Sequence, residues 1–158
     1  MLMRMEREER VIIEKAKEIE KLINELVEKM SWEGRGVEIL SMGLRKTIIS
    51  VLSHLTQCNP SFQVEVNRKY LQKSLSLLQS LEYYTYVSRK VGFISSSPHL
   101  RLREMIKDLK KHLFHSEKKL MFEEYEEMKN ILEYEGTGTR PGPSLRAPGT
   151  EGEKLLLS

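Results

Sequence analysis

The sequence predicts an all-α protein, an up-down-up-down four-helix bundle with a long fourth helix and a disordered C-terminal tail. Apolar residues recur at steps of three and four through four long stretches, which is the pattern of amphipathic helices. Short breaks containing Gly, Pro and Ser separate these stretches, and short connections favour antiparallel neighbours. We expect residues 1–135 to form the bundle.

The composition changes at Gly136. Five of the nine glycines and three of the five prolines lie in the last 23 residues, 136–158. Such a segment has too few apolar side chains to offset the entropy of folding. We therefore expect 136–158 to be a disordered Gly/Pro-rich tail or a cloning remnant that takes no part in the fold.

The first predicted helix runs from Met3 to about Ser31. Its many Glu, Lys and Arg residues surround an apolar stripe that consists of Ile12, Ala16, Ile19, Leu22, Ile23, Leu26 and Met30. The segment SWEGRG, residues 31–36, ends this helix, because its two glycines supply the backbone freedom that a helix exit needs.

The second predicted helix, 37–57, is poor in charge. From residue 39 to residue 64 the only full charges at neutral pH are Arg45 and Lys46. Large apolar side chains on its outer side are unfavourable in water by ~25 cal/mol per Å², so the bundle or a second copy should cover them. The candidate self-association residues of the homodimer that we predict are Ile39, Met42 and Ile49.

Two breaks place the third and fourth helices. In CNPSF, Pro60 disfavours helix at the residue before it, and Ser61 is suited to cap the next helix. The segment FQVEV alternates like a short strand, but it has no second strand to pair with, so we assign it to a third helix that ends near residue 91. After VGFISSSP, Ser97 and Pro98 have the form of an N-cap and a first helical residue, and the fourth helix continues to about residue 135.

Composition and cysteine content limit the class of protein. The chain is 39% apolar and 31% charged, as soluble helical domains are, and no apolar run approaches the roughly 18 residues of a membrane span. The single Cys58 makes no internal disulfide, and the charged opening MLMRMEREER is unlike a signal peptide. We expect a cytoplasmic protein without membrane contact, in the host cytoplasm or the virion if it is viral.

Histidines and glutamates on the fourth helix raise the question of a metal or acid/base site. Its core face, at ~100° per residue from Leu102, comprises Ile106, Leu109, Leu113, Leu120 and Ile131. His112 lies to one side of this face and His115 points largely away. A di-iron bundle needs inward Glu-x-x-His pairs, and the sequence contains none. We expect no enzyme activity, no cofactor and no small-molecule substrate; a surface metal site at His112 and His115 is an alternative.

Charge on the fourth helix is divided between two halves. Residues 98–120 carry seven Lys or Arg against three acids, whereas 121–135 carry six Glu against Lys129 alone. This order opposes the helix macrodipole, which favours acids at the start and bases at the end. Neighbouring helices or an antiparallel second copy would satisfy this pattern, and a solvated face without a partner is the plain alternative.

The turn between the third and fourth helices gathers basic and aromatic side chains. Basic groups interleaved with aromatics suit phosphates and unstacked bases, although tyrosines at helical spacing also serve as packing residues. Nucleic-acid binding is therefore the alternative function. Its candidate contacts are Arg89, Lys90, Arg101, Arg103, Tyr83, Tyr84 and Tyr86.

The segment EREERVIIEKAKEIEKLINELVEKM is similar in composition to proteins of hyperthermophilic archaea, in which charge networks are common. With the motif-free helical layout of residues 3–135, it resembles the orphan four-helix-bundle proteins of archaeal viruses and plasmids. The resemblance implies a protein that binds other macromolecules, and it transfers no functional residue. We expect a non-enzymatic interaction or assembly module that binds a protein partner or itself.

Overall fold

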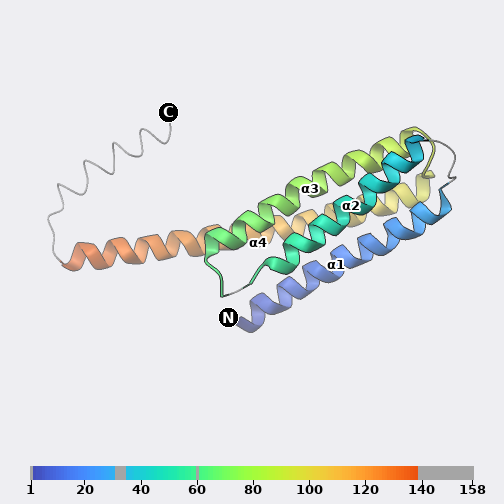
Figure 1. Cartoon of the computed structure of the whole chain (residues 1–158). Helices are drawn as coiled ribbons and strands as arrows, with labels where there is room; N and C mark the ends of the chain where they lie inside the picture. Colours follow the sequence, from blue (N-terminus) through green and yellow to red (C-terminus); the bar gives the residue numbers. More distant parts are fainter. Residues whose placement is uncertain (1, 31–34, 60, 139–158) are drawn as a thin grey trace, which may run out of the picture. The chain divides into compact units, whose positions relative to one another are not determined.

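The computed structural model describes residues 2–30, 35–59 and 61–138, and within them it contains four helices and no strand. These are α1 (Leu2–Lys29), α2 (Arg35–Gln57), α3 (Val64–Lys90) and α4 (Ser96–Gly138). Successive helices run in opposite directions (Figure 1). The predicted all-α bundle with a long fourth helix is confirmed. None of the helices described is both long and apolar enough to cross a membrane.

The chain divides into two compact units, Met1–Met121 and Phe122–Ser158. The first unit contains α1 to α3 and the first part of α4, and the second contains the rest of α4, which ends at Gly138 rather than near 135. The predicted tail lies outside the described residues from 139 onward. The proposed division at 135/136 therefore stays a prediction.

The core of the first unit takes fully buried aliphatic side chains from all four helices. Burial of each side chain contributes roughly 1.5–3 kcal/mol relative to exposure, so the apolar stripes hold the bundle together. The predicted stripe of α1 is buried from Ile12 to Met30. The largest fully buried side chains include Ile19, Ile23, Leu44, Ile48, Leu78, Leu81, Leu102, Ile106, Leu109 and Leu113.

Ion pairs on both sides of α4 place it against α1 and α3 in the first unit. Towards α1, Lys15 Nζ donates to Asp108 Oδ2 at 2.6 Å, and this hydrogen bond holds the pKa of Asp108 below its usual value. Towards α3, Lys110 Nζ donates to Glu82 Oε1 at 2.7 Å. Exposed pairs of this kind are worth only ~0–1 kcal/mol each, so they orient α4 more than they stabilise it.

The α2–α3 turn is fixed by Asn67, a residue that the sequence analysis did not single out. Its Oδ1 accepts from the Asn59 backbone N–H at 3.0 Å, and its Nδ2 donates to the Asn59 carbonyl at 2.7 Å. Ser61 is not the helix cap, because Gln63 occupies the N-cap position and makes no side-chain cap bond. The prediction for Ser61 was wrong because the Asn59 carboxamide accepts from Ser61 itself.

The α3–α4 turn depends on Gly92, whose φ of 86° is readily adopted only by glycine. Beyond it, the backbone N–H groups of Phe93 and Ile94 both donate to the Ser88 carbonyl. The chain then enters α4 at Ser96, one residue before the predicted cap at Ser97.

Candidate functional surfaces

The structure gathers part of the predicted nucleic-acid site into a group that we call the basic cluster, made of Arg89, Lys90, His99 and Arg103. Arg89 Nη2 donates to Ser96 Oγ at 2.6 Å, which ties α3 to the start of α4. Burial, followed by the charges of Arg89 and Arg103, lowers the pKa of His99. His99 is therefore neutral at pH 7, and the cluster's positive charge comes from the two arginines and Lys90.

Arg101 does not belong to the basic cluster. At ~100° per residue it lies about 160° around α4 from Arg103, on the side where Asp108 pairs with Lys15 of α1. Arg103 instead lines a hollow of about 290 Å³ together with Glu82, Thr85, Tyr86, His99 and Ile106. The seven predicted contacts therefore do not form one continuous surface.

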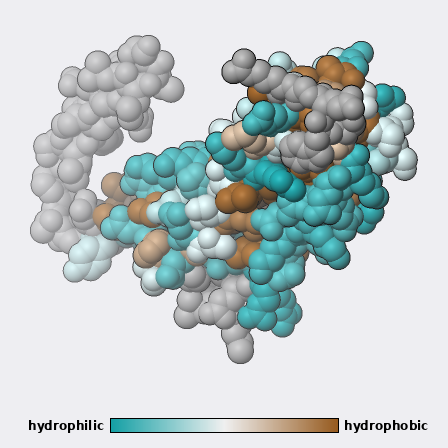
Figure 2. Space-filling model, turned by 45° about the vertical axis from the view of Figure 1, so that its right-hand side comes forward, coloured by the Kyte–Doolittle hydropathy of each residue, from teal (hydrophilic) through white to brown (hydrophobic). Residues whose placement is uncertain are grey.

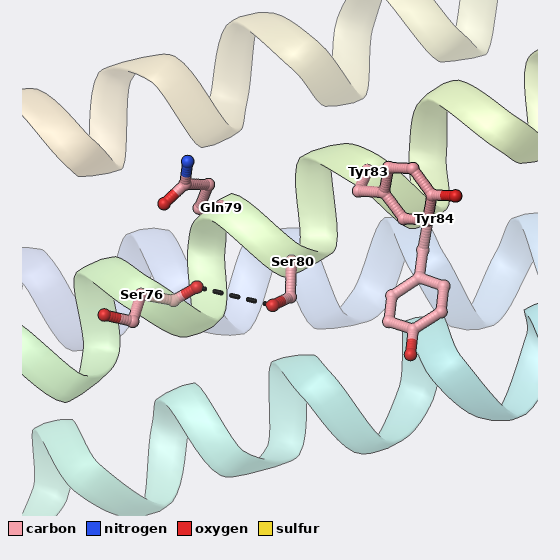
Figure 3. A pocket seen from close by; sticks show the side chains of 5 residues that line it. All are labelled: Ser76, Gln79, Ser80, Tyr83 and Tyr84. Atoms are coloured by element: carbon pink, nitrogen blue, oxygen red, sulfur yellow. Dashed lines mark hydrogen bonds between the residues drawn. The ribbon is translucent and has the colours of Figure 1, made fainter.

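The three tyrosines of the predicted site also separate. Tyr86 is 53% exposed, and Lys90 Nζ lies over its ring at 5.8 Å from the centroid, so Tyr86 belongs with the basic cluster. Tyr83 is 65% exposed and lines a second hollow, of about 270 Å³, with Ser76, Gln79, Ser80 and Tyr84. Tyr84 points toward α2 (Figure 3), where its ring lies against the backbone of Gly43. Tyr84 is therefore a packing residue.

The α2 strip, which we define as Ile39, Met42 and Ile49, lies at the surface of the first unit. Ile39 and Ile49 are each 58% exposed and Met42 is 45% exposed, so the bundle does not cover them. Lys46 is exposed on the same side of the helix. In Figure 2, apolar groups drawn in brown form separate patches within a largely hydrophilic face.

A further apolar surface, which we call the terminal face, consists of Phe122, Tyr125, Met128 and Leu132 in the second unit. Each of these four side chains is between 58% and 64% exposed. Ile131, which the helical wheel assigned to the core, is 57% exposed, and that prediction was wrong. The signal that the sequence analysis missed is a second apolar stripe, at steps of three and four, on another side of the same helix.

Side chains suited to metal or covalent chemistry do not assemble into a site in the described part of the chain. No group of three or more His, Cys, Asp or Glu residues there is able to hold a metal ion. His112 Nε2 lies 3.9 Å from Asp108 Oδ1, while His115 is exposed. Burial raises the pKa of Cys58 to about 12, with a smaller contribution from Glu9, so the thiol is protonated and unreactive at neutral pH.

These observations define the class as an all-α, four-helix protein with a basic cluster and two exposed apolar surfaces. Comparisons with protein-family models, with curated proteins and with solved structures gave no match to this chain.

Proposed function

We propose that the chain is a non-enzymatic helical-bundle module that acts through protein–protein contacts, as a partner-binding or assembly protein. The observation that carries the proposal is the exposure of large apolar side chains on the α2 strip and the terminal face. Exposed large apolar side chains are unfavourable in water, and where several gather on one side of a helix they are typical of interaction sites. We extend the proposal to a cytoplasmic protein of archaeal viral or plasmid origin, on the Glu/Lys/Arg/Ile-rich composition of α1.

Size-exclusion chromatography with light scattering, from low to high micromolar concentration, tests whether the chain associates with itself. If the α2 strip is the contact, replacing Ile39, Met42 and Ile49 by Ser should give a folded monomer. The matched control replaces two exposed polar residues of α3, Lys73→Gln and Gln79→Ser, and should behave as the unaltered chain does. A monomer at every concentration overturns the homodimer.

Nucleic-acid binding is the second candidate, because Lys90 and Arg103 of the basic cluster lie beside the exposed ring of Tyr86, and Arg89 is near His99 in the same cluster. Phosphate contacts by such residues make affinity fall steeply with salt. The test is fluorescence anisotropy of a labelled single-stranded oligonucleotide over a salt series. Charge reversal of the three cluster residues to Glu should abolish binding, whereas the control Arg101→Glu, on the other side of α4, should retain most of it. Equal losses would discard the basic cluster.

A further inference from the structure

The terminal face is not a continuation of the stripe that α4 buries in the first unit. Leu102, Ile106, Leu109, Leu113 and Leu120 form the buried stripe. At ~100° per residue, the next positions along that stripe are Glu124, Glu127 and Ile131, and Ile131 is 57% exposed, so the buried part of the stripe ends at Leu120. Tyr125, Met128 and Leu132 lie roughly 80–160° around the helix from the buried stripe. Their exposure therefore calls for an explanation other than the bundle's own core.

Charge decides which occupant suits the terminal face. Residues 122–134 contain five glutamates against Lys129, a net of four negative charges. The same segment of a second copy would bring two such sets of acids together, which is unfavourable. The occupant must therefore offer apolar groups within a positively charged surface.

The first unit carries such a surface on α4, which we call the lysine face: Lys107, Lys111, Phe114 and Lys118. All four side chains are exposed, and Phe114 is 50% exposed. At ~100° per residue they lie within about 60° of one another around the helix. The methylene stems of the lysines can cover apolar groups while their ammonium ends remain near acids in the solvent.

We propose that the terminal face of one chain docks on the lysine face of a second copy, with the two α4 helices antiparallel. This inference rests on the proposed function and names its partner. An antiparallel pair reverses the order of residues, so the acidic segment of each copy meets the basic segment of the other. A two-fold axis then repeats the contact, as in most homodimers.

The exposed area is consistent with this arrangement. Large apolar side chains that are about 60% exposed leave about 110 Å² each for burial, or roughly 450 Å² for the four residues of the terminal face. One contact, counted on both partners, would bury about 900 Å², which is short of the ~1,200–2,000 Å² of stable interfaces. Two symmetric contacts would bury about 1,800 Å², within that range.

The first experiment measures the dimer dissociation constant of full-length variants by light scattering and sedimentation. Tyr125→Ser with Met128→Ser should raise the constant about 100-fold, because both truncations fall in the middle of the interface. The matched control, Glu123→Gln with Asn130→Ser in the same segment but away from the terminal face, should leave it within about threefold. Circular dichroism verifies that each variant keeps its helices.

The second experiment tests the charge pattern. Lys107→Glu with Lys111→Glu should weaken the dimer at least tenfold, by placing acids against acids. Adding Glu124→Lys and Glu126→Lys to the same chain restores opposite charges and should recover most of the affinity. Failure of this rescue in a folded protein would overturn the proposed pairing.

The third experiment identifies the contact directly in the unaltered chain. Carbodiimide joins lysine amines to carboxylates that touch, and mixing ¹⁴N and ¹⁵N copies reveals which products join two chains. We expect mixed-isotope peptides linking Lys107, Lys111 or Lys118 to Glu124 or Glu126, which flank the terminal face. A dimer that persists in the Tyr125/Met128 variant but dissociates in the α2 strip variant overturns this inference and leaves the proposed function standing. A monomer at all concentrations overturns the homodimer in both forms.

Discussion

Replacing Gly43 by Ala in the middle of α2 should destabilise the protein, although alanine is the better helix former. A Cβ built on Gly43 would lie 2.7, 2.8 and 2.9 Å from Cε1, Cδ1 and Cζ of the Tyr84 ring. These distances are well inside van der Waals contact, so the ring or the helix has to move. Ala gains about 1 kcal/mol over Gly in a helix interior, whereas overpacking costs about 1–3 kcal/mol. We expect a net loss of about 1 kcal/mol.

Urea and thermal unfolding followed by circular dichroism measure this loss, which corresponds to a fall of about 3–5 °C in Tm. The double variant Gly43→Ala, Tyr84→Leu removes the ring, so in that background the alanine should stabilise by about 1 kcal/mol relative to Tyr84→Leu alone. Gly36→Ala is the control, because its Cβ would meet Phe93 only at 3.9 Å. A higher Tm for Gly43→Ala alone would refute the close packing of Tyr84 on α2.

Three further predictions concern the turn, the thiol and the tail. In a urea titration, Asn67→Ala should lower the free energy of unfolding by about 2 kcal/mol, because two Asn59 backbone groups lose their hydrogen-bond partners. The control Gln63→Ala loses no cap bond and should have little effect. The raised pKa of Cys58 means that the contribution of its protonated thiol to stability is complete below pH 9 and is lost as pH rises from 9 toward 12. Between pH 8 and a pH above 10, the free energy of unfolding in urea should therefore fall less for Cys58→Ala than for the unaltered chain. Deleting residues 139–158 should leave the Tm unchanged by circular dichroism, and a drop of several degrees would show that the tail packs.

Periodicity predicted the helices and most of the core because an apolar stripe must be buried for a helix to be stable in water. It was less informative for α3, where Ser74, Thr85 and Ser88 are buried. Ser74 and Thr85 donate their hydroxyl groups to carbonyls one turn earlier, at 2.9 and 2.8 Å. Such local bonds allow polar residues into a core, and apolar spacing does not register them.

Candidate sites were harder to predict than helices because they depend on which sides of two helices meet. Arg101 and Arg103 are two residues apart in sequence but on nearly opposite sides of α4, and only Arg103 lies with His99 and Tyr86. Adjacent Tyr83 and Tyr84 likewise differ: the first is at the surface and the second packs on Gly43. The residues of the basic cluster could therefore be distinguished from their sequence neighbours only in the three-dimensional structure.

The two apolar stripes of α4 differ in burial, so they need different explanations. The stripe that ends at Leu120 lies in the core, together with residues of the other three helices. If the helix had no further contact to make, polar residues could occupy the positions after Leu120, as Glu124 and Glu127 do on the side that continues the buried stripe. Large apolar residues at 122, 125, 128 and 132 instead expose surface that is unfavourable in water. Because acids flank this surface and lysines flank Phe114, the antiparallel contact that we propose would satisfy both the apolar and the charged groups of α4.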